Sequence, residues 1–139
     1  MVIIIETGIY IRVSTEEQAQ NGYSIRAQKE KLSVYSKIKD WNVIDFYIDE
    51  GISGTSSVKR ENFMKMVEEG KQKKFDLLIT KEVSRFSRDT IDSLVYTRKL
   101  LEYDVCVYFL SDNIITASSD GELRLTIMSS MAQDEIRKI

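Results

Sequence analysis

The sequence predicts an α/β fold with a mainly parallel central sheet and helices on both of its faces. Short apolar runs rich in β-branched and aromatic residues alternate with segments whose apolar residues recur at helical spacing. This alternation is typical of βαβ units, in which crossover helices cover a parallel sheet. The chain has 139 residues, no proline and no low-complexity stretch, so we expect one domain over residues 1–139.

Four segments are expected to form buried strands. Each is a short, mostly apolar run bounded by polar or turn-forming residues. They span residues 8–13, 43–48, 75–80 and 105–110. The single cysteine, Cys106, lies inside the last run, where the pattern favours a small buried hydrophobe over a reactive thiol.

Three helices are expected between these strands. Ser24 is a suitable cap for a helix that continues to about Asp40, and Asp89 for the third helix. Gly70 is expected to close the second helix. The residues expected to face the core are Phe63, Met66 and Val67 in the second helix and Ile91, Leu94 and Val95 in the third.

The last expected helix begins near Gly121 and carries apolar residues over a wide arc. Two adjacent stripes together cover about 220° of its circumference, at about 100° per residue. The stripes are Leu125, Met128, Ala132, Ile136 and Ile139, and Leu123, Ile127 and Met131. One sheet face cannot cover that arc, so the helix is either wholly internal or packed on both its own domain and a partner subunit. We favour the second interpretation, which predicts self-association.

Composition excludes several kinds of chemistry. The sequence has no histidine, which rules out an imidazole base, His-ligated zinc or haem, and Ser-His-Asp or Cys-His nucleophile pairs. The net charge of −2 gives no global basic field for nucleic acid. No glycine-rich phosphate loop follows a strand, so no nucleotide cofactor is expected. Residues 1–5 lack the features of a signal peptide or membrane span, so we expect a cytoplasmic protein.

Cationic and hydroxyl side chains follow the expected strands, where sites form in open α/β sheets. Alternation places Arg12 and Ser14 on the same face of the first strand. Arg85 and Arg88 have the i, i+3 spacing that aims two guanidinium forks the same way. Arg60 follows the loop after the second strand and can add a third fork. The pattern suits a phosphate ligand.

Other interpretations of these residues remain open. Asp49, Glu50 and Asp76 are candidate magnesium ligands for phosphoryl transfer, although one acidic pair at a strand end lacks the carboxylate set of a two-metal site. Each residue alone also has a structural interpretation: Ser14 as a cap, Asp49 as a turn residue, and an isolated arginine as a solvated charge.

Four motifs in this order resemble the catalytic domain of the serine recombinases, the resolvase and invertase family. They are Tyr10-Ile11-Arg12-Val13-Ser14-Thr15, Gly22-Tyr23-Ser24-Ile25-Arg26-Ala27-Gln28, Asp49-Glu50-Gly51-Ile52-Ser53-Gly54 and Ser84-Arg85-Phe86-Ser87-Arg88. The resemblance extends over essentially the whole chain and is strongest to the large serine recombinases, the phage integrases and conjugative-transposon recombinases. It implies a resolvase-like catalytic domain with a truncated C-terminal oligomerisation helix, and DNA-binding domains absent from this chain.

The resemblance also implies roles for individual residues. Ser14 would attack a DNA phosphodiester to form a 5′-phosphoserine intermediate, after which strands are exchanged and rejoined without metal, cofactor or ATP. The residues that would bind the phosphate are Arg12, Arg60, Arg85 and Arg88. Gln28 and Asp49 match supporting positions. Ser84 stands where many members have aspartate, so it is placed in the site without assigned chemistry.

The implied partners are double-stranded DNA with recombination sites, a homodimer and synaptic homotetramer built on the last helix, and a directionality factor. No membrane is implied. The rival interpretation is a noncatalytic DNA-associated or regulatory module on the same fold, whose arginines bind phosphate without cleavage, because a fold alone does not establish an activity.

Overall fold

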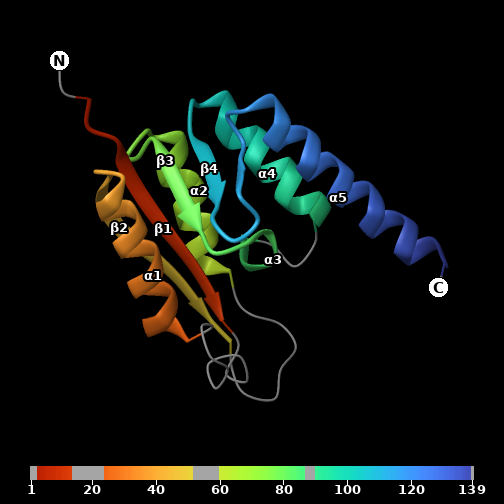
Figure 1. The fold of residues 1–139 in the computed structure, drawn as a ribbon, viewed down its shortest axis with the longest axis horizontal. Coiled ribbons are helices and arrows are strands. Elements are labelled where there is room, and N and C mark those ends of the chain that lie inside the picture. Colours follow the sequence, from red (N-terminus) through yellow and green to blue (C-terminus); the bar gives the residue numbers. More distant parts are fainter. Residues whose placement is uncertain (1–2, 14–23, 52–59, 87–89, 139) are drawn as a thin grey trace.

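The computed structural model describes residues 3–13, 24–51, 60–86 and 90–138 of the chain (Figure 1). In chain order the elements are β1 (Glu6–Val13), α1 (Ile25–Ile38), β2 (Asn42–Glu50), α2 (Glu61–Lys71), β3 (Leu77–Thr80), α3 (Val83–Phe86), α4 (Thr90–Glu102), β4 (Cys106–Phe109), β5 (Ile114–Ile115) and α5 (Ser119–Lys138). The strands form one sheet in the order β2-β1-β3-β4-β5. Only the β4–β5 pairing is antiparallel among these strands. The predicted α/β fold with a mainly parallel sheet is confirmed.

The helices cover the two faces of the sheet unequally, as Figure 1 shows. Of the described helices, α1 alone lies on one face, where Leu32 packs against Ile9 and Ile11 of β1. Helices α2, α3, α4 and α5 contribute to the core on the other face. Because side chains alternate along a strand, Tyr10 of β1 points to this second face. We call the two faces the α1 face and the α2–α5 face.

An aromatic cluster occupies the α2–α5 face. The ring of Phe86 lies edge-on to the rings of Tyr10, Phe63 and Phe109, with centroid separations of 6.4, 5.0 and 5.5 Å. All four side chains are fully buried. Edge-to-face aromatic pairs contribute about 0.5–1.5 kcal/mol each beyond the area they bury. The cluster therefore holds the short helix α3, which carries Phe86, against β1 and α2.

The four predicted strands are present with shifted ends. β1 and β2 begin earlier than predicted, whereas β3 and β4 are shorter. Cys106 is half-buried in β4, and burial raises the pKa of its thiol, in agreement with the predicted apolar role. Strand β5 was not predicted, because two residues are too few to give a periodic signal.

The ends of the helices partly follow the prediction. Ser24 is the N-cap of α1, where its Oγ accepts a hydrogen bond from the backbone N–H of Ala27 at 3.1 Å. Gly70 does not end α2, which corrects the prediction. A Cβ at Gly70 would lie 2.9 Å from Cδ2 of Leu100, so the glycine serves the close packing of α2 on α4.

The residue with left-handed backbone after α2 is Lys73, with φ of 59°. The predicted cap Asp89 lies outside the described residues.

The inward face of α4 also differs from the prediction. Of the three residues expected to face the core, Val95 is 55% exposed and the other two are only partly buried. The buried residues are Ser93, Thr97 and Leu100, at i, i+4 and i+7. The Thr97 hydroxyl donates to the carbonyl of Leu94 at 3.0 Å, so this polar group is satisfied within the helix. Leu94 does pack against the core, so apolar spacing identified the inward face only in part.

Helix α5 is not wholly internal. It begins at Ser119, and its first stripe packs on the core through Leu125, which is 1% exposed, and Met128. The residues of the second stripe, Leu123, Ile127 and Met131, are 58, 49 and 60% exposed. The helix thus presents a second apolar stripe away from its own domain.

Within the described part of the chain, no helix combines the length and apolar character that crossing a membrane requires.

Candidate active site

Three strand ends meet at one edge of the sheet. β1 pairs in parallel with both β2 and β3, so the carboxyl ends of all three strands lie at the same edge. Arg12 near the end of β1 is the register partner of Asp49 near the end of β2. Both residues alternate onto the α2–α5 face with Tyr10 and Tyr47. Helix α3 begins three residues after the end of β3 at this same edge.

Two arginine side chains reach α3, and a third extends from α3 to the end of β1. Nη2 of Arg12 donates a hydrogen bond to the backbone carbonyl of Ser84, and Nη2 of Arg60 donates to that of Phe86. Nη1 of Arg85 donates to the carbonyl of Arg12 at 3.4 Å. Guanidinium groups from β1, from the residue before α2 and from α3 are therefore held by backbone carbonyls where the end of β1 meets α3. We call these three residues the arginine cluster.

The arginine cluster is positively charged and largely withdrawn from solvent. Arg12 is 7% exposed and Arg85 is 9% exposed. Nε of Arg85 lies 3.8 Å from Oε1 of Glu82, and the Arg60 guanidinium lies 3.7 Å from the centroid of the Phe63 ring. Burying a cation is costly unless an anion or hydrogen-bond acceptor compensates, so such a site favours an anionic ligand. Planar guanidinium forks match the oxygens of a phosphate.

Asp49 is bound to the start of α2. Its Oδ1 accepts the backbone N–H of Asn62 at 3.0 Å, and its Oδ2 accepts that of Phe63 at 3.0 Å. Oδ2 also accepts the hydroxyl of Tyr10 at 2.8 Å. The N-cap residue itself, Arg60, makes no side-chain capping bond. Asp49 therefore caps α2 from a neighbouring strand, where the negative charge also complements the helix dipole.

Tyr10 is a site residue that sequence reasoning missed. Burial raises the pKa of its hydroxyl, the nearby Asp49 carboxylate raises it further, and the Arg60 guanidinium opposes both. Its backbone carbonyl accepts the hydroxyl of Thr80 at 2.9 Å. The available signal was the alternation that places Tyr10 on the same face as Arg12, two residues along the first motif.

The other expected site residues are distributed differently. Gln28 is 1% exposed on the inner side of α1, on the opposite face of the sheet from the arginine cluster. The side chain of Ser84 is exposed, whereas its carbonyl receives the bond from Arg12. Ser14 and Arg88 lie outside the described residues.

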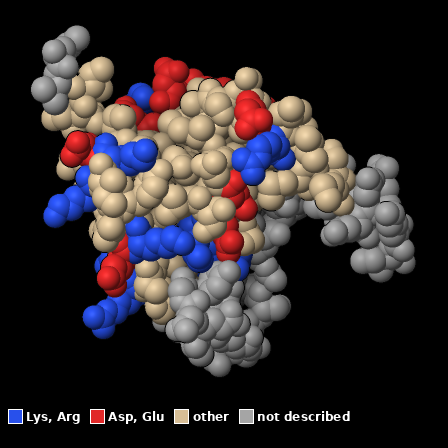
Figure 2. Space-filling model, in the orientation of Figure 1, with Lys and Arg blue, Asp and Glu red and all other residues tan. Residues whose placement is uncertain are grey.

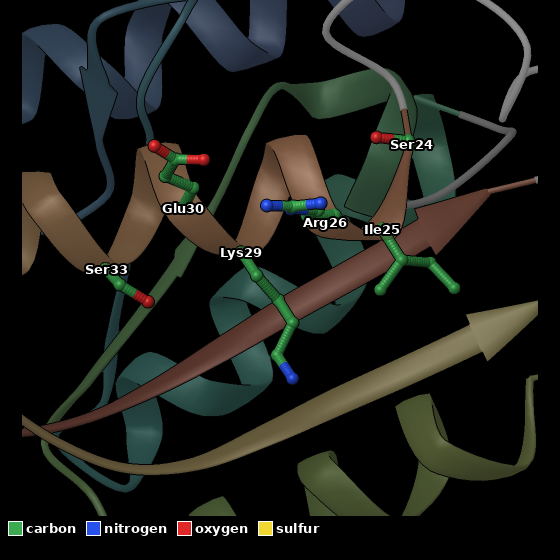
Figure 3. A pocket seen from close by; sticks show the side chains of 6 residues that line it. All are labelled: Ser24, Ile25, Arg26, Lys29, Glu30 and Ser33. Carbon is green, nitrogen blue, oxygen red and sulfur yellow. The ribbon is translucent and has the colours of Figure 1, made fainter.

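A pocket in the described part of the chain lies away from the arginine cluster. It has a volume of about 670 Å³ and follows the first turns of α1, as Figure 3 shows. The residues that line it are Ser24, Ile25, Arg26, Lys29, Glu30 and Ser33. Lys29 extends from α1 toward β2, where its Nζ lies 4.8 Å from the centroid of the Phe46 ring. None of the three arginines lines this pocket.

The alternative magnesium site is not formed. Asp49 and Glu50 lie at the carboxyl end of β2, whereas Asp76 precedes β3 and its backbone N–H donates to the carbonyl of Glu6 at the start of β1. Asp76 is therefore at the opposite edge of the sheet, because parallel strands start together. Among residues 3–13, 24–51, 60–86 and 90–138, no group of three or more Cys, Asp or Glu side chains is placed to hold a metal ion.

Comparison with known proteins identifies relatives along almost the whole chain. Residues 7–139 match the family described as "Resolvase, N terminal domain". The chain is 31% identical over 131 residues to the R46 site-specific recombinase of Escherichia coli, covering 94% of this chain and 62% of that protein. It spans less than two thirds of the length of the curated relatives it matches.

Two solved structures share the fold over nearly their whole length. The N-terminal catalytic domain of TP901-1 integrase is 32% identical, with a TM-score of 0.77 over 95% of this chain and 97% of that one. A resolvase family site-specific recombinase from Streptococcus pneumoniae is 29% identical, with a TM-score of 0.80 over 96% of this chain and 91% of that one.

Proposed function

The chain belongs to the resolvase N-terminal domain family of serine recombinases, and we therefore propose that it is the catalytic domain of a site-specific DNA recombinase. The arginine cluster carries the proposal. Three guanidinium groups from separate elements surround the edge of the sheet where β1 ends, and Ser14 is the residue that directly follows β1. A hydroxyl and several phosphate-binding cations are the groups that attack on a phosphodiester requires.

The proposed reaction begins with Ser14 as the nucleophile. Its hydroxyl oxygen forms a bond to the phosphorus of a DNA backbone phosphodiester, and the bond from phosphorus to the 3′ oxygen breaks. The serine loses a proton and the departing 3′ oxygen gains one, which leaves a 3′-hydroxyl end and a 5′-phosphoserine end. The product keeps one phosphodiester bond for each one broken, so attack by a new 3′-hydroxyl rejoins the strands without ATP.

The arginines stabilise the transition state in this scheme. Negative charge develops on the nonbridging oxygens, and each well-aimed donor lowers the barrier by about 3–4 kcal/mol. Arg12, Arg60 and Arg85 are already oriented by carbonyl groups of β1 and α3. Arg88 is the fourth proposed phosphate ligand. Several such donors supply the charge stabilisation that a metal ion supplies in other phosphoryl-transfer sites, so no metal or cofactor is required.

The supporting residues act through backbone and packing. Asp49 holds the start of α2 and thereby the backbone of Arg60. The carbonyl of Ser84 orients Arg12. Gln28, which is buried on the inner side of α1, is the remaining proposed supporting residue.

The proposed partners are double-stranded recombination-site DNA, a second copy of the chain, and a directionality factor, all in the cytoplasm. Charges of both signs are mixed over the face shown in Figure 2, and the net charge of the whole chain is −2, so most DNA affinity is assigned to further domains of the protein. The exposed stripe of α5 is the proposed dimer contact, extended to a tetramer in synapsis.

Sedimentation of this domain should show association that Ile127→Glu weakens. A monomer at all concentrations would contradict the contact.

Substitution of the nucleophile tests the proposal. In the full-length protein, Ser14→Ala should abolish DNA cleavage and leave DNA binding nearly intact, because the hydroxyl is required for the covalent step alone. Cleavage is measured on recombination-site DNA, and binding by gel shift at fixed salt. Equal loss of both would indicate a structural or binding role for Ser14. Intact binding with no cleavage by the unmodified protein would favour a noncatalytic phosphate-binding module.

A further inference from the structure

Two tyrosine–carboxylate pairs attach α2 to the sheet. Tyr10 and Tyr47 are register partners on β1 and β2, and both are buried on the face that α2 covers. The Tyr10 hydroxyl donates to Oδ2 of Asp49 at 2.8 Å, and the Tyr47 hydroxyl donates to Oε1 of Glu69 at 2.7 Å. The pairs are chemically alike but hold different parts of the helix. Glu69 is nine residues beyond Arg60, which is about 13 Å along a helix at 1.5 Å per residue.

The Tyr10 pair lies beside the arginine cluster. The carboxylate that accepts its hydroxyl also accepts the backbone N–H groups of Asn62 and Phe63. Arg60 is the N-cap residue of the same helix, two residues before Asn62. The orientation of the Asp49 carboxylate therefore determines where the first turn of α2 begins, and that turn determines the position of the Arg60 backbone.

The ring of Tyr10 contacts the groups that hold the Arg60 side chain. The Arg60 guanidinium lies over the ring of Phe63 and donates to the carbonyl of Phe86. The Tyr10 ring lies edge-on to both Phe63 and Phe86, at centroid separations of 5.3 and 6.4 Å. The Arg60 guanidinium also acts directly on the Tyr10 hydroxyl, where it opposes the effect of Asp49. Tyr10 is thus coupled to Arg60 through its hydroxyl, which also holds the helix start, and through its ring, which contacts the two phenylalanines.

We propose that Tyr10 is a positioning residue for Arg60, acting through the Asp49 carboxylate that caps α2. This inference rests on the proposed function, because it assumes that Arg60 binds the scissile phosphate. The hydroxyl supplies the third hydrogen bond described at Asp49 and sets the rotation of the carboxylate about its side chain. Burial and Asp49 raise the pKa of Tyr10, so the hydroxyl keeps its proton and remains a donor throughout the neutral range.

Matched phenylalanine substitutions separate positioning from general stability. Tyr10→Phe and Tyr47→Phe each remove one tyrosine hydroxyl and keep the ring. The first leaves Asp49 without its tyrosine donor, and the second does the same to Glu69. In the full-length protein, we expect the two variants to have similar thermal unfolding temperatures. Single-turnover cleavage of nicked recombination-site DNA at saturating protein should fall at least about tenfold in Tyr10→Phe and less than about twofold in Tyr47→Phe. Equal losses of cleavage would overturn the proposal.

A double substitution tests whether Tyr10 acts through Arg60. If it does, Tyr10→Phe should slow cleavage by less than about twofold in the Arg60→Ala background, because the group it positions is absent. Loss of the full tenfold in that background would overturn the positioning role and leave the proposed function intact. Absence of cleavage by the unmodified protein, with DNA bound, would instead overturn the proposed function and this inference together.

Discussion

The α2–α5 face and the α1 face of the sheet hold aromatic side chains in different surroundings. On the α2–α5 face, Phe86 is fully buried among three other aromatic rings. On the α1 face, three aromatic rings contact one another but stay partly exposed. They are Tyr35, Trp41 and Tyr108, with centroid separations of 5.7 to 6.1 Å.

The hydroxyl groups on the two faces differ in the same way. Tyr10 and Tyr47 donate to carboxylates inside the α2–α5 face, whereas the hydroxyls of Tyr35 and Tyr108 lie 3.1 Å from each other near solvent. The guanidinium groups are oriented on the densely covered face. The comparison teaches that the arginine cluster lies where close packing fixes it, as the proposed function requires, because a transition-state donor must already be aimed when charge develops.

Truncation of one aromatic ring on each face should show the largest difference. Phe86→Ala should lower the free energy of unfolding by about 3–5 kcal/mol, since it removes a fully buried ring and leaves a cavity. Tyr108→Ala should cost about 1–2 kcal/mol, because that ring is only partly buried. Urea denaturation of this domain measures both values. Equal costs would show that the two faces are packed alike.

Removal of one cation from each face should separate catalysis from surface charge. Arg85→Ala should slow DNA cleavage by at least about 100-fold, because it removes a donor to the developing charge. Lys39→Ala, on the α1 side, removes an exposed ammonium 5.7 Å from the Tyr35 ring and should leave the rate within about twofold. Single-turnover cleavage with protein in excess over DNA measures both. An unchanged rate in Arg85→Ala would remove that residue from the site.

Alkaline pH should reveal a smaller difference between the faces. The hydrogen bond with Tyr35, followed by burial, raises the pKa of Tyr108 to about 12, and burial raises the pKa of Tyr10 further. A folded-state pKa above the ordinary value of about 10 means that stability is complete below pH 10 and is lost as pH rises through the folded-state value. The free energy of unfolding should therefore fall above about pH 10.

Phenylalanine variants show which tyrosine causes the loss of stability at alkaline pH. Tyr10→Phe should flatten the pH dependence of unfolding more than Tyr108→Phe only as the pH approaches the folded-state pKa of Tyr108, about 12, because below it both hydroxyls keep their protons in the folded state. Urea unfolding at several pH values between about 10 and 12.5 measures the slopes. A steeper dependence in Tyr10→Phe than in the unmodified protein would contradict the assignment.

Much of the fold was accessible from the sequence because its elements are long or strongly patterned. The parallel strands have continuous apolar runs, and Ser24 gives a clear helix start. Helix α3 and strand β5 were missed because four and two residues carry no measurable period. The roles of Gly70 and Val95 depend on how α2 and α4 pack together, which local patterns do not contain.

The sequence was enough to predict which residues lie at the site, but not the hydrogen bonds that hold them in place. Strand alternation and the carboxyl-edge rule brought Arg12 and Asp49 together correctly. No local pattern indicates that Asp49 caps a helix beginning twelve residues later, or that backbone carbonyls of α3 orient two arginines. These contacts connect segments far apart in the chain, so the part played by Tyr10 emerged only from the structure.

The central claim is that Ser14 forms a covalent bond to DNA beside an arginine cluster that needs no metal ion. Full-length protein is incubated with its recombination-site DNA in EDTA, quenched with denaturant, and digested so that any protein–DNA adduct can be mapped by mass spectrometry. We predict a 5′-phosphate joined to Ser14. DNA that is bound but yields no adduct, even when it is nicked to trap the intermediate, would contradict the account.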